Sequence, residues 1–187
     1  MGKVIVEQIV TADGYASRKD GGIGFFDASG DFRDAEGEQM EMLRSVGAIV
    51  FGANTYRMFA DYWPGADGKV ERVTAPINSL PKFVVSNTLR SAPWGGQGQV
   101  EILRGDGVES VRGLRRRTGG DLVIWGSLTL TDALFRAREV DVLRLRTVAV
   151  LLGEGRSFSP DGLGDLELAL QHVHAYPSGH IVTQYST

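Results

Sequence analysis

Short runs of apolar and β-branched residues recur along the chain. They cover residues 4–6 and 9–10, 48–51, 83–85, 100–103, 122–125 and 140–151. Runs of about four to six apolar residues without polar alternation are typical of strands that are buried on both faces. The pattern therefore predicts the strands of a largely buried sheet.

Between these runs the apolar residues follow a helical spacing. Met40, Leu43 and Val46 lie three residues apart and predict a helix over 34–46. Further helices are expected over 54–59, 108–117 and 128–137, and Asp106 and Ser127 stand where they can cap the last two. Strands and helices thus alternate up to about residue 140, which indicates a parallel sheet with helices on both faces.

The end of the chain breaks this alternation. Residues 166–176 and 180–185 flank Pro177-Ser178-Gly179, a sequence typical of a hairpin turn. We therefore expect a mixed sheet that is mostly parallel and ends in an antiparallel C-terminal hairpin.

Length and composition restrict the class of protein. The 187 residues suit one domain over 1–187, and the lack of Cys excludes disulfides, zinc–thiolate sites and a thiol nucleophile. A net charge of -3 gives no general attraction to nucleic acid or to an anionic membrane. The apolar runs are too short to span a bilayer, and Glu7 and Gln8 interrupt any signal peptide. We expect a cytoplasmic protein that binds neither nucleic acid nor membrane.

Two of the expected strands lead through a glycine directly into a helix. Gly52 follows residues 48–51, and Gly126 follows residues 122–125. Ligands of open α/β sheets collect at such strand ends, and the N–H groups at a helix start attract phosphate. Either glycine alone could simply permit a tight turn, but two such junctions in one sheet favour a phosphate-bearing ligand. The usual dinucleotide fingerprint, the Walker A sequence and the nucleophile elbow are absent from the sequence.

An ordered set of short motifs carries a family resemblance. It consists of Asp13-Gly14-Tyr15, Gly52-Ala53-Asn54-Thr55-Tyr56, Val84-Val85-Ser86, Val123-Ile124-Trp125-Gly126-Ser127 and Val150-Leu151-Leu152-Gly153-Glu154-Gly155. Over about residues 3–158 the chain resembles the dihydrofolate-reductase-like superfamily. The closest branch is the reductase domain of the bifunctional riboflavin-biosynthesis deaminase-reductase and its stand-alone bacterial relatives. The resemblance implies a three-layer α/β fold and an NADPH-dependent reductase.

The resemblance also implies positions for the cofactor. It places Val10 and Ala12 near the nicotinamide, Gly52, Asn54 and Thr55 at cofactor phosphate, Ser86 and Asn87 near the adenosine ribose phosphate, and Gly126, Ser127 and Leu128 at the pyrophosphate. The family commonly has Arg at the position of Ala53, so NADH is possible besides NADPH. Ser127 replaces the second glycine of a family Gly-Gly pair, which narrows the space for backbone approach.

A carboxylate beside the nicotinamide could hydrogen-bond the substrate and favour its protonated form. Asp13 is the first candidate for this catalytic role, although Asp-Gly is also a strong turn pair. Asp27, Asp31 and Asp34 remain alternatives. Phe26, Tyr56, Trp63 and Trp125 could stack on a flat substrate, or could belong to the core. Trp125 stands where riboflavin-pathway reductases often have Glu, which argues against their sugar-phosphate substrate.

His172, His174 and His180 could chelate a metal, because the first two alternate along one strand. They lie far along the chain from the phosphate junctions, and we interpret them as structural or solvent-facing, with no metal site.

The leading hypothesis is an NADPH-dependent oxidoreductase that transfers hydride to a small pterin- or pyrimidine-like heterocycle. The alternative is a non-catalytic nucleotide- or ligand-binding module on the same fold, which Ala53 and Ser127 would suit. By family analogy, and because a hairpin edge invites strand pairing, we also expect a homodimer through the C-terminal strands.

Overall fold

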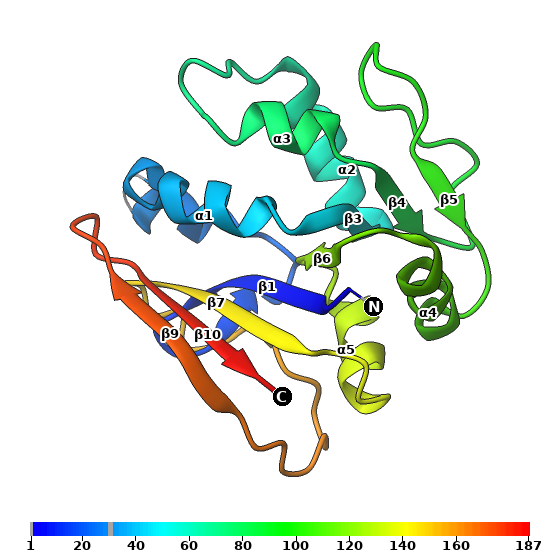
Figure 1. Cartoon of the computed structure of the whole chain (residues 1–187). Coiled ribbons are helices and arrows are strands. Elements are labelled where there is room, and N and C mark those ends of the chain that lie inside the picture. The colour runs from blue at the N-terminus through cyan, green and yellow to red at the C-terminus, as the bar shows by residue number, and fades with distance from the viewer. Residues whose placement is uncertain (1, 30–31) are drawn as a thin grey trace.

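An eight-stranded mixed sheet organises the computed structural model, which describes residues 2–29 and 32–187. Its strands are β1 (Val4–Thr11), β3 (Val46–Gly52), β4 (Lys82–Val85), β5 (Glu101–Leu103), β6 (Asp121–Trp125), β7 (Val142–Val148), β9 (Ala169–Ala175) and β10 (Ile181–Ser186). They are ordered β5-β4-β3-β6-β1-β7-β10-β9 (Figure 1). The pairs from β5 to β7 are parallel, whereas β10 is antiparallel to both β7 and β9. The predicted fold class and C-terminal hairpin are confirmed.

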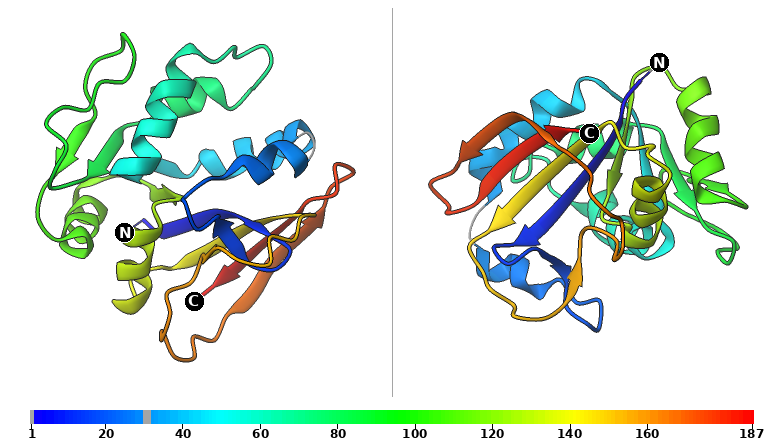
Figure 2. Two further views of the ribbon diagram at one scale, coloured as in Figure 1. Left: turned by 180° about the vertical axis from the view of Figure 1, so that it is seen from behind. Right: turned by 90° about the horizontal axis from the view of Figure 1, so that it is seen from below.

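Helices cover both faces of the central strands (Figures 1 and 2). The helices are α1 (Glu36–Leu43), α2 (Ala53–Tyr62), α3 (Thr74–Ser79), α4 (Gly107–Arg117) and α5 (Leu128–Arg136), with short 3-10 helices η1 (Gly24–Ser29), η2 (Phe32–Ala35) and η3 (Trp63–Gly65). Leu43, Tyr56 and Ile77 of the first three α-helices pack on one face, in a cluster with Ile49 and Phe51. Val111, Leu114, Leu130 and Leu134 of α4 and α5 pack on the other face.

The first predicted helix is too long at its C-terminal end. Helix α1 ends at Leu43, and Val46 is the first residue of β3, where it pairs with Asp121 of β6. Val46 continues the three-residue spacing of the helix because it faces the same core as Leu43, although it already belongs to the strand. Helix α3 was missed; it has only six residues and contains Pro76. A two-stranded sheet of β2 (Tyr15–Ser17) and β8 (Arg156–Ser157) was also missed.

Both ends of the chain join the same part of the sheet. The Val4 N–H donates to Asp141 Oδ2 at 2.7 Å, and the Thr187 N–H donates to the Asp141 carbonyl. No helix in the described part of the chain has the length and apolar character needed to cross a membrane.

Candidate functional site

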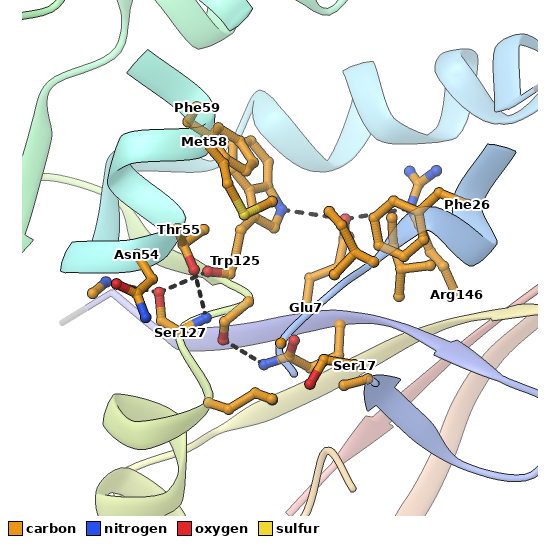
Figure 3. Close-up of a pocket in the computed structure, with 18 of the residues that line it drawn as sticks. Glu7, Ser17, Phe26, Asn54, Thr55, Met58, Phe59, Trp125, Ser127 and Arg146 are labelled. Carbon is orange, nitrogen blue, oxygen red and sulfur yellow. Dashed lines mark hydrogen bonds and ion pairs between the residues drawn. The ribbon is translucent and has the colours of Figure 1, made fainter. Parts of the chain in front are cut away.

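A cleft of about 1560 Å³ opens where the central parallel strands end. Gly52, Val85 and Trp125, the last residues of β3, β4 and β6, all line it. This is the edge of an open α/β sheet at which ligands collect. The cleft has two chemically different ends, which Figure 3 shows at the left and right of the close-up.

The left end consists of two strand-to-helix junctions that are tied together. The Gly52 N–H donates to the Ser127 hydroxyl at 2.7 Å, and the Ser127 N–H donates to Thr55 Oγ1 at 2.9 Å (Figure 3). The same Ser127 hydroxyl donates to the Trp125 carbonyl at 2.9 Å. The buried side chains of Thr55 and Ser127 therefore hold the starts of α2 and α5 next to each other.

Gly126 is required at this junction. Its φ of 54° lies in the left-handed region, and an added Cβ would lie only 2.9 Å from Thr55 Oγ1. Ser127 also has a positive φ of 56°, which is uncommon for a residue with a side chain. The Ser127 hydrogen bonds to both neighbouring elements hold this backbone conformation in place.

Neither α2 nor α5 is capped by a side chain, although α4 is. Asp106 accepts a hydrogen bond from the Glu109 N–H at 2.9 Å, as predicted. The prediction that Ser127 caps α5 is wrong, because its hydroxyl is used by Trp125 and Gly52 instead. The first N–H groups of α2 and α5 thus have no side-chain acceptor, and a helix start of this kind suits a phosphate group.

The right end of the cleft is a buried charged cluster. Glu7 of β1 lies next to Arg144 of β7 in the sheet register, and Glu7 Oε2 is 2.8 Å from Arg144 Nε. Arg146 Nε lies 3.3 Å from Glu7 Oε1, to which Gln39 and Trp125 also donate hydrogen bonds. All of these residues are buried, and all except Arg144 line the cleft. Converging donors and acceptors at one end of an apolar cleft can orient a polar ligand edge.

Aromatic side chains form part of the cleft wall, and Figure 3 places Phe59 and Trp125 between the two ends. Trp125 stacks on Phe59 with ring centroids 5.4 Å apart, and Phe26 and Trp63 also line the cleft. Tyr56 does not line it: its ring is buried in the core and its hydroxyl donates to the Pro93 carbonyl. The helical spacing turns Tyr56 away from the cleft that Asn54 and Thr55 line.

Asp13 lies outside the cleft and organises a turn. Its carboxylate accepts hydrogen bonds from the Thr11 hydroxyl and from the backbone N–H groups of Leu152 and Gly153. These donors, the Thr11 hydroxyl first, hold the pKa of Asp13 below its ordinary value. Asp13 therefore has the contacts of a turn residue. Its position outside the cleft gives no support to the predicted catalytic role. Val10 and Ala12 do not line the cleft either.

The remaining predicted cofactor residues and carboxylates lie partly in the cleft and partly outside it. Gly52, Asn54, Thr55, Gly126, Ser127 and Leu128 all line the cleft, as does Ala53. Ser86 and Asn87 do not; the Ser86 hydroxyl accepts from the N–H groups of Thr88 and Leu89. Asp34 accepts from the Ser178 N–H and does not line the cleft. Asp31 and the side chain of Asp27 lie outside the described residues.

Sequence reasoning missed Glu7, Gln39 and Arg146. The signal was present, because Glu7 and Gln8 interrupt an apolar strand and Arg144 and Arg146 alternate within another. Charged side chains in a buried strand need partners. The three histidines do not converge: His172 and His174 lie near Glu38, whereas His180 is buried against Ser178.

Comparisons with known proteins agree with this architecture. The chain is 24% identical over 185 residues to the uncharacterized protein YyaP of Bacillus subtilis, covering 98% of this chain and 94% of that protein. A candidate riboflavin biosynthesis protein of Shewanella sp. PV-4 has a structure with a TM-score of 0.77 at 20% identity, covering 98% of both chains.

A bifunctional enzyme extends the comparison. The diaminohydroxyphosphoribosylaminopyrimidine deaminase/5-amino-6-(5-phosphoribosylamino)uracil reductase of Thermotoga maritima has a TM-score of 0.66 at 17% identity. The match covers 99% of this chain and 56% of that enzyme. The dihydrofolate reductase of Enterococcus faecalis has a TM-score of 0.58 at 13% identity, covering 99% of this chain and 96% of that chain. This likeness confirms the dihydrofolate-reductase-like fold that the motifs predicted. The model of the RibD C-terminal domain matches residues 2–182, and the chain therefore belongs to the RibD C-terminal domain family.

Proposed function

We propose that this protein is an NADPH-dependent reductase of a small heterocycle. Membership of the RibD C-terminal domain family supports a reductase-type function. The observation that carries the proposal is that one cleft has two different ends. The starts of α2 and α5, which no side chain caps, lie at one end. The charged cluster of Glu7 and Arg146, with aromatic side chains beside it, lies at the other. A dinucleotide and a second small molecule can lie end to end in such a cleft.

The cofactor phosphates would lie at the junction of α2 and α5. Both helix starts present backbone N–H groups, and the positive ends of both helix dipoles favour an anion there. Gly52 and Gly126 have no side chains to keep a phosphate away from the backbone. The residues present thus fit the pyrophosphate of a dinucleotide.

The substrate would lie against the charged cluster. Arg146, Gln39 and Glu7 offer donor and acceptor groups to the polar edge of a pterin- or pyrimidine-like ring, and Trp125 and Phe26 offer flat surfaces to its faces. When bound, NADPH supplies a hydride, and the reduced bond of the substrate gains that hydride together with one proton. The Arg146 guanidinium can hold a substrate oxygen on which negative charge develops.

The choice between NADPH and NADH depends on cations near the ribose. Ala53 provides none, but Arg104 donates hydrogen bonds to the Ser86 and Leu89 carbonyls, beside the segment that the resemblance assigns to the ribose phosphate. Arg104 can therefore replace the missing family Arg as a partner of the 2′-phosphate. We propose NADPH as the preferred cofactor on this basis.

An isosteric charge change tests the cofactor position. Asn54 is exposed, lines the cleft and occupies the first turn of α2, so Asn54→Asp adds one negative charge there. Such a charge stabilises the helix start but repels phosphate. Calorimetric titration should show NADPH binding weakened at least about tenfold, with an unchanged or higher melting temperature. Gln97→Glu, in a loop away from the cleft, is the matched control and should bind as the wild type does.

Turnover is tested separately, by following the absorbance of the reduced nicotinamide as NADPH is oxidised in the presence of pterins and pyrimidines. Oxidation that depends on one such heterocycle supports the reductase. Tight NADPH binding with no oxidation by any of them would favour the non-catalytic module. If Asn54→Asp and the wild type bind NADPH with equal affinity, the cofactor phosphate does not lie at the α2–α5 junction.

A further inference from the structure

We propose that Glu38, His172 and His174 form a binding site for a first-row transition-metal dication, with Zn²⁺ as the reference ion. The two histidines come from β9 and the carboxylate from α1, and a donor atom of each lies within 4.8 Å of the other two. His172 Nε2 is 3.4 Å and His174 Nδ1 is 4.0 Å from Glu38 Oε2. The site lies outside the cleft, and it would give His172 and His174 a role beyond the structural or solvent-facing one expected from the sequence.

Sheet geometry brings the two imidazoles together. His172 and His174 are separated by one residue, so their side chains extend from the same face of β9. Their partners in β10 are Gln184 and Val182, which confirms the shared face. The register shift leaves Gln171 of β9 unpaired, between Leu170 and His172, so the alternation of His172 and His174 is intact. Helix α1 places Glu38 against the same face.

Two of the three ligands, Glu38 and His174, are held in position by neighbouring groups. The Tyr176 hydroxyl and the Arg144 guanidinium both donate to the Glu38 carboxylate, and the Tyr176 ring stacks on His174 with centroids 4.3 Å apart. Groups that orient the ligands in this way are typical of metal sites in proteins.

The spacing suits a small tetrahedral ion. Zn²⁺ binds nitrogen and oxygen ligands at about 2.0–2.2 Å, which requires ligand atoms about 3.3–3.6 Å apart. The His172–Glu38 distance meets this condition. The His174–Glu38 distance of 4.0 Å exceeds it, and the two imidazole donor atoms lie within 4.8 Å of each other, so His174 must move towards both other ligands. About half of each histidine side chain is exposed, so an ion can enter and a water molecule can complete the coordination. Three protein ligands and one open position distinguish this arrangement from a closed structural zinc site.

The chemistry of the chain narrows the choice of ion and of ligands. The protein contains no Cys and three His, and the third, His180, is buried with its Nδ1 against Ser178. Two imidazoles and a carboxylate suit Zn²⁺, Ni²⁺ or Cu²⁺ better than Ca²⁺ or Mg²⁺. Arg144 and Arg146 are nearby cations that oppose binding, but Arg144 is paired with both Glu38 and Glu7, and Arg146 with Glu7.

The experiment uses the untagged full chain, freed of metal by a chelator. Calorimetric titration with Zn²⁺ should give one ion per chain with a dissociation constant in the micromolar range, and Co²⁺ should give the visible absorption of a tetrahedral complex. His172→Ala and His174→Ala should each weaken Zn²⁺ binding at least about tenfold. Both side chains are well exposed, so both variants should fold, and circular dichroism checks this.

Gln171→Ala is the matched control, because Gln171 is an exposed neighbour on the same strand. It should bind Zn²⁺ as the wild type does. The proposal is overturned if the wild type shows no saturable binding up to about 1 mM Zn²⁺. It is equally overturned if His172→Ala and His174→Ala bind Zn²⁺ with wild-type affinity, since the chain offers no other accessible imidazole.

Discussion

Glu7 and Arg146 carry opposite charges inside the sheet, where an unpaired charge is costly. Each arginine of β7 shares the Glu7 carboxylate, and Gln39 and Trp125 donate to the same group. At the scale of single residues, the cluster therefore depends on Glu7 more than on any one of its partners. Removing one member of a buried ion pair leaves the others uncompensated, which costs more than the pair itself contributes.

Glu7→Gln should lower the free energy of unfolding by about 3 kcal/mol. The amide removes the negative charge that two buried arginines share, while keeping the shape of the side chain. Urea denaturation measures the change. Glu154→Gln is the control, because Glu154 pairs with Lys19 in an exposed ion pair and should change the stability by less than about 1 kcal/mol. Equal stability of the two variants would mean that Glu7 is not a partner of both arginines.

Asp13→Asn should lower the melting temperature at neutral pH without changing NADPH affinity, because Asp13 holds a turn outside the cleft. The pKa of Asp13 is lowered in the folded protein, so its stabilising effect is present above the unfolded value of 3.8 and is lost as the pH falls below it. The difference in melting temperature between wild type and variant should therefore shrink towards about pH 3. Loss of NADPH turnover in a fully folded variant would restore Asp13 as a catalytic residue.

The junction of α2 and α5 is the element that connects the fold to the cleft. Thr55 was predicted to contact phosphate, but its hydroxyl accepts the Ser127 N–H and so shapes the turn that precedes α5. Thr55 therefore positions the second helix start in addition to lining the cleft.

Thr55→Val should leave the Ser127 N–H without a partner, at a cost of about 1–3 kcal/mol in stability. Because the turn before α5 then loses its position, the NADPH dissociation constant should rise several-fold. Thr131→Val removes a comparable hydroxyl from α5, one that donates to the Leu128 carbonyl, and serves as the control. Calorimetry and thermal denaturation of both variants make the comparison. Unchanged NADPH affinity in Thr55→Val would mean that the junction does not position the cofactor.

Sequence patterns predicted the elements well and the charged cluster poorly, for physical reasons. Buried parallel strands must be apolar on both faces, so residues 122–125 identify β6 directly. Glycines at tight turns likewise marked both helix starts. The cluster instead depends on the register that sets Glu7 opposite Arg144, and that register arises only when β1 pairs with β7 across 137 residues of sequence. The position of Tyr56 was also not predictable, because the local sequence does not tell which side of α2 faces the cleft.

At the scale of the whole molecule, strand β9 is an open edge. All seven of its residues are exposed, and register places Leu170 and Val173 with Ile181 on the face opposite His172. Exposed apolar side chains beside an unpaired edge favour association with another strand. The predicted homodimer through the C-terminal strands remains our proposal.

Light scattering at micromolar concentration should give the mass of a dimer, twice 20.3 kDa. Val173→Lys should shift the protein towards the monomer, because a charge in an apolar interface loses its solvation. Leu151→Lys is the control, since Leu151 is exposed in a turn outside the hairpin. A monomeric wild type at this concentration would reject the dimer.

The most direct test of the cleft as a dinucleotide site is a fluorescence titration with NADPH. Trp125 lines the cleft between its two ends, so a bound dihydronicotinamide should quench its emission. We predict saturable quenching with a dissociation constant in the micromolar range, and weaker quenching at saturation in Trp125→Phe. The account is contradicted if neither NADPH nor NADH, at concentrations up to about 1 mM, changes the fluorescence or the melting temperature.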